Sequence, residues 1–193
     1  GGAFYAIASS VIEQGGVVFG AKIEEPCYVH HQAIEAKEKL NYLQGSKYTH
    51  SDASGNYKLA LKYLKEGRMV LFSGTGCQIA GLLSFLKDRT YKGNLITLDL
   101  ICGGIPSRIL IDKFISQAPY KVKRILSFRT KETGWKPGGF RYNLKVEDEN
   151  GKIYDYANKN NLNFENIKLT DISSNRLWLT SERLKKEFKE LRY

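Results

Sequence analysis

The sequence predicts an α/β protein with a mixed, largely parallel central sheet flanked by helices, and with an antiparallel hairpin extension in its last third. The first observation is that apolar strand-like and amphipathic helix-like segments alternate between residues 68 and 117, which is typical of parallel strands joined by helical crossovers. The second is the run Glu149-Asn150-Gly151-Lys152, which is typical of a type I′ hairpin turn. With 193 residues, 42% of them apolar, the chain can bury a sizeable core.

The first part of the chain contains five predicted elements. Apolar residues at helical spacing predict a helix at 2–13, which ends at Gly15-Gly16. Short strands are predicted at 17–23 and 27–31, on either side of Pro26. Amphipathic helices are predicted at 34–43 and 57–65, each ended by a glycine, Gly45 and Gly67.

The middle and last parts supply the strand–helix alternation and the hairpin. Residues 68–73 form a predicted strand, Gly74-Thr75-Gly76 a tight turn, and 77–87 a helix; a buried strand at 94–101 and a helix at 107–117 follow. Strands are predicted at 122–130, 140–146 and 153–157, and a charged helix at 181–191. We expect two parts: residues 1–157 as one α/β domain, and residues 158–193 as a loop and charged helix that pack on it.

The charge of the chain is strongly basic, at +10, and the excess is concentrated between Arg108 and Lys145, where ten basic residues face two acidic ones. Nucleic acid, a phosphorylated cofactor or an acidic protein would each fit this pattern, and so would a solvated surface. No helix-turn-helix or RNA-binding signature accompanies it, so a nucleic-acid-binding domain is the least favoured of these hypotheses.

Composition also limits location and metal chemistry. No apolar run is long enough to span a membrane and no signal peptide is recognisable, so we expect a cytoplasmic protein. Three cysteines without a C-x-x-C pair, and three histidines, predict neither a disulfide framework nor a metal site. Because the chain begins with Gly and its one Met is Met69, we expect it to be a piece of a longer product.

The segment 68–87 is the best candidate site by its physical chemistry. Glycines allow close backbone approach, and a helix N-terminus presents N–H groups and a positive dipole end to a phosphate or to the polar edge of a flavin. The segment is not a P-loop, because Leu82 stands where Lys is required, and not a dinucleotide fingerprint, because Ile79 stands at the third Gly position. A sharp strand-to-helix turn that merely needs small residues is the alternative interpretation.

Two cysteines and one basic loop are further candidates. Cys77 starts the predicted helix, where the dipole favours a thiolate, although a small buried residue is the alternative. Cys102 ends a strand at the carboxyl edge of the sheet, where open α/β sheets bind ligands. Trp135, Arg129 and Lys131 could stack on a planar ring and pair with phosphates, or form an ordinary surface loop. His30-His31 is interpreted as a strand end rather than a ligand pair.

Five sequence blocks, in order, are similar to the flavin-binding region of the coenzyme F420 hydrogenase/dehydrogenase beta-subunit family. The blocks are Gly1-Gly2-Ala3-Phe4 with 11–21, Gly45-Ser46-Lys47-Tyr48, 70–81 with its Gly74-Thr75-Gly76-Cys77-Gln78, 94–107 with its Cys102-Gly103-Gly104-Ile105-Pro106-Ser107, and Phe128-Arg129-Thr130-Lys131 with Gly134-Trp135. Together they cover about residues 1–145. The resemblance implies an oxidoreductase that binds FAD and passes electrons between it, an iron–sulfur module or redox partner protein, and a small-molecule electron carrier.

The resemblance also implies which residues hold the flavin. Those that would line its pocket or meet its phosphates are Gly45, Ser46, Lys47, Tyr48, Gly74, Thr75, Gly76, Cys77, Gln78, Cys102, Gly104, Pro106, Ser107, Arg129 and Lys131. We place the diphosphate at the start of the helix after Gly74–Gly76. Cys77 and Cys102 are the candidate catalytic residues.

Three departures from the family pattern leave a second hypothesis open. Gly76 stands where the family has Pro, and Gly103 where it has His. The ferredoxin-like module and the cysteine-bearing segment that the resemblance implies are not matched, so we expect no iron–sulfur cluster within this chain. The chain could therefore be a non-catalytic relative that serves as a subunit-docking module.

Overall fold

The computed structural model describes residues 2–87, 91, 93–102, 105, 108–127 and 145–155. The chain divides into two compact units: unit 1 is Gly1–Glu24 with Tyr28–Gly103, and unit 2 is Glu25–Cys27 with Gly104–Tyr193. The sequence did not predict this division. The expected boundary between residues 157 and 158 lies outside the described residues and stays a prediction.

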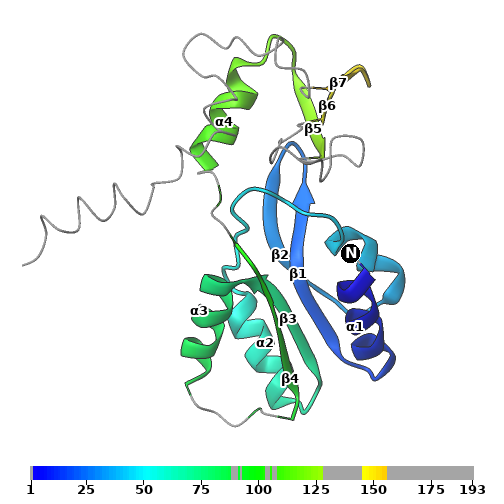
Figure 1. Ribbon diagram of the computed structural model, residues 1–193, viewed down its shortest axis with the longest axis vertical. Helices are drawn as coiled ribbons and strands as arrows, with labels where there is room; N and C mark the ends of the chain where they lie inside the picture. The colour runs from blue at the N-terminus through cyan, green and yellow to red at the C-terminus, as the bar shows by residue number, and fades with distance from the viewer. Residues whose placement is uncertain are drawn as a thin grey trace, which may run out of the picture. The chain divides into compact units, whose positions relative to one another are not determined.

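Unit 1 is a three-layer α/β structure (Figure 1). Its elements are α1 (Gly2–Glu13), β1 (Val17–Glu24), β2 (Tyr28–Ile34), the 3-10 helix η1 (Lys37–Leu43), α2 (Asn56–Lys65), β3 (Val70–Thr75), α3 (Gly76–Leu86) and β4 (Leu95–Leu100). Among the described residues, the strands form one sheet in the order β2-β1-β3-β4. β1 and β2 are antiparallel, while β1–β3 and β3–β4 are parallel. The mixed, largely parallel sheet is thus confirmed.

Two apolar clusters hold the layers together, one on each face of this sheet. On one face, Val17, Phe19, Val70 and Phe72 pack against α2 and α3, while on the other Val18 and Leu71 pack against α1 and η1. Alternate residues of β1 and β3 therefore point to opposite faces and both faces are buried, which explains why these strands are continuous apolar runs.

Two predicted elements of unit 1 differ in the structure. The helix predicted at 34–43 is shorter, because Ile34 pairs with Val18 as the last residue of β2 and only Lys37–Leu43 is helical, as a 3-10 helix. The strand predicted at 94–101 forms as β4, but it is an outer strand of the sheet, and all of its residues are exposed or half-buried rather than buried.

Unit 2 contains α4 (Arg108–Gln117) and an antiparallel sheet of β5 (Val122–Ser127), β6 (Lys145–Asp148) and β7 (Ile153–Asp155) among its described residues. The hairpin extension is confirmed, but its turn is not type I′. The Gly151 N–H donates to Asp148 O, Gly151 has a φ of 81°, and Asn150 does not have the positive φ that type I′ requires. The loop is thus a tight turn followed by one left-handed glycine.

No helix in the described part of the chain combines the length and apolar character needed to cross a membrane. The strand predicted at 122–130 is described only to Ser127, and that at 140–146 only from Lys145. The helix predicted at 181–191 lies outside the described residues.

Candidate cofactor-binding site

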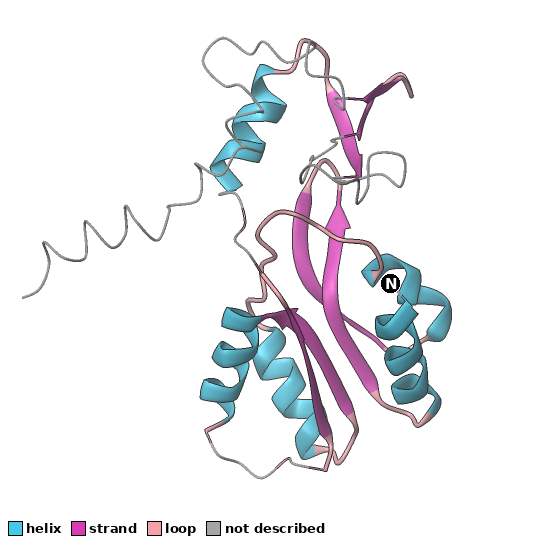
Figure 2. Cartoon of the chain, in the orientation of Figure 1, coloured by secondary structure: helices cyan, strands magenta, loops and turns pink. Residues whose placement is uncertain are grey.

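The candidate site lies in unit 1, at the edge where the parallel strands β3 and β4 end. The last pair in their register is Thr75 with Leu100. The segment 44–55, which joins η1 to α2, crosses this end of the sheet (Figure 2). It is fixed there by a parallel bridge of Asp52 with His30 on β2 and by a hydrogen bond from Gln78 Nε2 to Ser51 O, at 2.8 Å. The edge thus brings together residues from three separate stretches of the chain.

The predicted tight turn at Gly74-Thr75-Gly76 is not a turn. β3 continues to Thr75, and α3 begins at the next residue, Gly76, so the strand passes directly into the helix. Thr75 and Gln78 form a capping box, in which Gln78 Oε1 accepts a 3.0 Å hydrogen bond from the Thr75 N–H. The spacing Thr-x-x-Gln signals such a box, so this feature could have been found in the sequence.

The inner half of this junction, which we define as Ser73, Gly74 and Gln78, is filled by the protein itself. A Cβ on Gly74 would lie 3.1 Å from Gln78 Oε1, 3.2 Å from Gln78 Cβ and 3.4 Å from His31 Nε2. Both ends of the Gln78 amide are engaged, since its nitrogen also donates to Ser51 O. The absence of a side chain at Gly74 therefore allows the close approach of Gln78 and His31.

His31, which is not among the predicted cofactor-binding residues, lies buried at this end of the sheet. The residue is 3% exposed, and its ring stacks on Phe72, with ring centroids 5.2 Å apart. Nε2 lies 3.0 Å from Ser73 O and Nδ1 lies 2.8 Å from Ser51 Oγ. Burial lowers the pKa of His31, which favours the neutral ring. The prediction of a strand residue was right, but His31 lies within β2 rather than at its end.

The outer half of the junction, which we define as Thr75, Gly76 and Cys77, is open to solvent. Thr75 and Gly76 are half-buried, Cys77 is exposed, and Thr75 Oγ1 lies 3.1 Å from Cys77 Sγ. Beside it stands Asp99 of β4: a Cβ on Gly76 would meet its Oδ2 at 3.4 Å. A carboxylate beside the first residue of α3 stabilises the positive end of the helix but opposes a second anion there.

The loop at Gly45–Tyr48 is the second stretch predicted to hold the cofactor. Gly45 and Ser46 are exposed, and Lys47 and Tyr48 are half-buried. Lys47 Nζ donates to Gln44 O at 2.7 Å and to Tyr42 O at 3.3 Å, so it caps the end of η1. Burial lowers the pKa of Lys47 to about 8. In this arrangement the ammonium is engaged by the protein's own carbonyl groups rather than presented to a phosphate.

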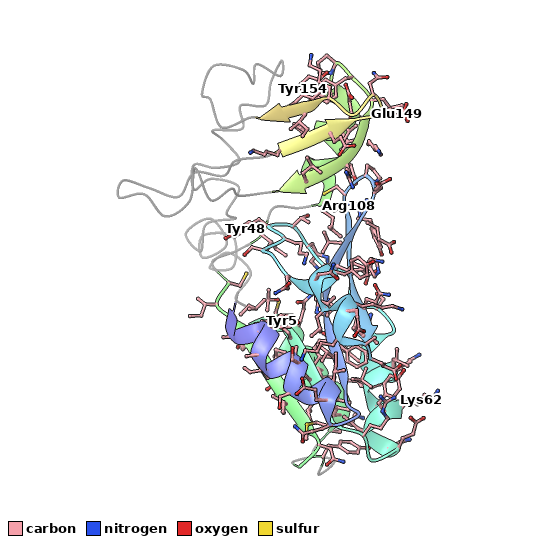
Figure 3. All side chains as sticks on the ribbon, turned by 90° about the vertical axis from the view of Figure 1, so that its right-hand side faces the viewer. Tyr5, Tyr48, Lys62, Arg108, Glu149 and Tyr154 are labelled. Atoms are coloured by element: carbon pink, nitrogen blue, oxygen red, sulfur yellow. The ribbon has the colours of Figure 1, made fainter. Side chains whose placement is uncertain are left out.

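Aromatic rings also gather toward this end of unit 1. Figure 3 shows Tyr5, in the first turns of α1, and Tyr48, in the loop, both toward the end of the sheet where β3 terminates. Tyr5 is 37% exposed. Tyr5 therefore adds an exposed aromatic ring toward this end of unit 1, whereas Tyr48 is half-buried.

The three cysteines differ sharply in their surroundings. Cys77 and Cys102 are exposed thiols, in the outer half of the junction and just after β4. Cys27 in unit 2 is 1% exposed, and burial raises the pKa of its thiol to about 12. Only the two cysteines predicted as candidate catalytic residues are therefore open to reagents among these three.

Several predicted site residues lie outside the described residues, and their roles stay predictions: Gly103, Gly104, Pro106, Ser107, Arg129, Lys131 and Trp135. Within the described part of the chain, no group of three or more His, Cys, Asp or Glu side chains could hold a metal ion.

The described cations of the basic stretch 108–145 are largely paired with acids. Lys121 pairs with Glu149 at 2.6 Å, and Lys123 and Arg124 both pair with Glu147, at 3.2 and 2.7 Å. Arg108 pairs with Asp112 at 3.0 Å. These pairs reduce the positive field that the sequence count suggested, and with it the argument for nucleic acid.

These features define an α/β unit of the kind that carries its functional residues at the carboxyl ends of parallel strands. Residues 67–161, which include β3, α3 and β4, match the family that is described as the C terminus of the coenzyme F420 hydrogenase/dehydrogenase beta subunit. This region of the chain belongs to that family of oxidoreductase subunits, as the resemblance predicted.

One solved structure extends this likeness to the fold. A chain of the F420-reducing NiFe hydrogenase complex from Methanosarcina barkeri superposes with a TM-score of 0.53 at 19% identity, over 80% of this chain and 53% of that one. This chain thus spans about half the length of the solved chain that it matches. No curated protein matches the sequence.

Proposed function

We propose that this chain is the flavin-binding redox domain of an oxidoreductase of the F420 hydrogenase/dehydrogenase beta-subunit type, with FAD held at the carboxyl edge of sheet β2-β1-β3-β4. The observation that carries the proposal is the strand-to-helix junction at Thr75-Gly76, which lies at that edge and within the region matched by the family. Ligands of open α/β sheets bind outside the carboxyl ends of the strands, which supports this placement.

The residues at this edge fit a flavin in part. Thr75 Oγ1 and the exposed Cys77 offer polar and polarisable contacts on the open half of the junction, and Ser46 adds an exposed hydroxyl from the neighbouring loop. We now place the diphosphate away from the start of α3, unlike the expectation from the sequence, because Asp99 already supplies a negative charge there. We therefore assign this junction to the uncharged ring system of FAD.

The roles of the chain's own residues follow from this assignment. When bound, the flavin would supply two-electron chemistry, with the protein providing orientation and electrostatics. Asp99 is placed to accept a hydrogen bond from an N–H group of a ring, and Thr75 Oγ1, whose hydrogen is donated to Gln78 Oε1, could accept one. Gln78 and Gly74 shape the floor on which the ring would rest, because the bonds of Gln78 to Thr75 and Ser51 hold it in place. The electron donor and acceptor would belong to partners outside this chain.

The direct test is to measure the binding of FAD to the purified full chain by isothermal titration calorimetry. FMN, which lacks the adenylate, is the matched control ligand. We expect saturable FAD binding with a Kd of about 10 μM or tighter, and at least about tenfold weaker binding of FMN. A colourless protein with no detectable affinity for FAD would overturn the proposal. Equal affinity for both would overturn the choice of FAD.

Asp99→Asn separates the two placements of the cofactor. If the ring N–H groups face Asp99, the substitution weakens FAD binding by about three- to tenfold, because a charge-assisted hydrogen bond becomes a neutral one. If the diphosphate lies there, removing the negative charge strengthens binding instead. Glu66→Gln, at the far end of α2, is the control for a change of one charge, and we expect no effect from it.

An activity assay on the same purified protein distinguishes the alternative, a non-catalytic docking module, from the catalytic hypothesis. Such a relative would hold flavin in stoichiometric amount yet show no turnover with artificial electron donors and acceptors. We favour the catalytic hypothesis because the outer half of the junction, with Thr75 and Cys77, is open rather than filled.

A further inference from the structure

The candidate site is formed by the loop 44–55 and by the junction at the end of β3, which are far apart in sequence. The buried side chain of His31 contacts both of them. His31 of β2 contacts Ser73, the residue before Gly74, through Nε2, and Ser51 of the loop 44–55 through Nδ1. Its own backbone continues the connection: the His31 N–H donates to Asp52 O at 2.7 Å, and His31 O accepts from Asn56 Nδ2 at 3.1 Å.

The hydrogen bonds assign the tautomer of the His31 ring. A backbone carbonyl can only accept, so Nε2 must carry the hydrogen that is donated to Ser73 O. In the neutral ring Nδ1 is then an acceptor, and it receives the hydroxyl hydrogen of Ser51. Both ring nitrogens are used, and the stack on Phe72 fixes the plane of the ring.

Gln78 makes a second connection between the loop and the junction. Gln78 at the start of α3 donates to Ser51 O, so Ser51 is held by its hydroxyl from His31 and by its carbonyl from Gln78. A Cβ at Gly74 would touch both of these partners, which shows how closely the three side chains pack. The loop and the junction can therefore not shift independently while His31 is in place.

We propose that His31 is a positioning residue, which holds the loop 44–55 and the end of β3 in one arrangement so that both present their polar groups to the same ligand. This inference rests on the proposed function for the identity of that ligand as FAD. The mechanical part, the coupling of the loop to the junction, stands on the contacts alone.

Three variants test the coupling in the full chain. His31→Phe keeps an aromatic ring on Phe72 but loses both hydrogen bonds. His31→Gln keeps a donor for Ser73 O and an acceptor for the Ser51 hydroxyl. Ser51→Ala removes only the hydrogen bond between the Ser51 hydroxyl and His31 Nδ1. It is the milder change, to be used if His31→Phe does not fold. His50→Gln, at an exposed histidine in the same loop, is the control.

Hydrogen–deuterium exchange gives a readout that needs no flavin. We expect His31→Phe to raise exchange at least about tenfold in both 44–55 and 73–78 while α2 and β1 stay protected, and His31→Gln to restore much of the protection. Ser51→Ala should affect 44–55 more than 73–78. Unchanged exchange in both segments, or an equal rise throughout unit 1, would overturn the coupling.

FAD affinity supplies the second readout. His31→Phe should raise the Kd about tenfold, with rescue by His31→Gln, whereas His50→Gln should leave it within about twofold. If the loop and junction loosen but FAD affinity is unchanged in His31→Phe, the positioning role is wrong. If the unmodified chain itself binds no FAD, the proposed function fails, and the exchange experiment still decides whether His31 couples the two segments.

Discussion

The two halves of the strand-to-helix junction have similar sequences but opposite environments. In the inner half, Gly74 faces Gln78 and His31, and the polar groups of Gln78 are bonded within the protein. In the outer half, Gly76 and Cys77 face solvent and the carboxylate of Asp99. Glycine at one position makes room for the protein's own side chains, and at the other leaves the helix start uncovered. A glycine-rich junction is therefore not by itself a ligand-binding surface; its chemistry depends on which half is already filled.

The largest contrast should be in the reactivity of the thiols of Cys77 and Cys27, because thiol reactivity depends directly on exposure to solvent. With iodoacetamide at about pH 8, we expect Cys77 to be alkylated at least about 100-fold faster than Cys27, measured by mass spectrometry of peptides. Cys27 is buried and its pKa is raised to about 12, so only about one molecule in ten thousand carries its thiolate at that pH. Comparable rates would show that the outer half is covered in solution.

The next contrast compares alanine at the two glycines. Gly74→Ala should lower the free energy of unfolding by about 1–3 kcal/mol, because its methyl group would press on the Cβ of Gln78, which cannot move without α3. Gly76→Ala should change it by less than about 0.5 kcal/mol, because its contact with Asp99 is an ordinary one. Urea unfolding of both variants measures the difference. Equal effects would mean that the inner half is not packed as described.

The sequence predicted the framework of this site better than its contacts. The strand and helix around Gly74–Gly76 follow from apolar periodicity, and so does their place at the carboxyl edge. The contacts of His31 could not be predicted, because its partners Ser51 and Ser73 lie 20 and 42 residues away in the sequence. Periodicity reports which face a residue takes, and His31 shows that a polar residue on a buried face needs a partner that only the fold supplies.

Asp99 shows a different limit of sequence analysis. It interrupts an apolar strand near its end, which marks it as unusual, but its position beside Gly76 depends on the parallel register of β3 with β4. Register between strands separated by a helix is not encoded in either strand alone. A helix start that looks free in the sequence therefore already has an anion beside it.

The third contrast separates Gln78 from its neighbour Cys77. Gln78→Ala removes the acceptor for the Thr75 N–H and the donor to Ser51 O, so we expect a loss of about 1–2 kcal/mol in the free energy of unfolding. Cys77→Ala, one residue away on the open side, should cost less than about 0.5 kcal/mol. Gln78→Glu should be intermediate, because a carboxylate still accepts from Thr75 but cannot donate to Ser51 O. A Gln78→Ala variant as stable as Cys77→Ala would show that this cap contributes nothing.

The smallest contrast is in the pH dependence of stability. The pKa of His31 is lowered in the folded protein by burial, so the unfolded chain binds more protons over the interval below its ordinary pKa of 6.5. Stability should therefore fall as the pH falls from about 7 toward 5, by at most about 1.4 kcal/mol per pH unit from this one group. The carboxylates with lowered pKa, such as Asp52 at about 2, act at lower pH and do not obscure this interval.

His31→Gln isolates the contribution of the imidazole, because it has no group that titrates there yet retains a donor and an acceptor. Urea unfolding at pH 5, 6 and 7 should show that stability depends less steeply on pH in His31→Gln than in the unmodified chain. Identical slopes for the unmodified chain and His31→Gln would mean that the ring is not held neutral by burial. The inner half would then be accessible to water, and the distinction between the two halves of the junction would be lost.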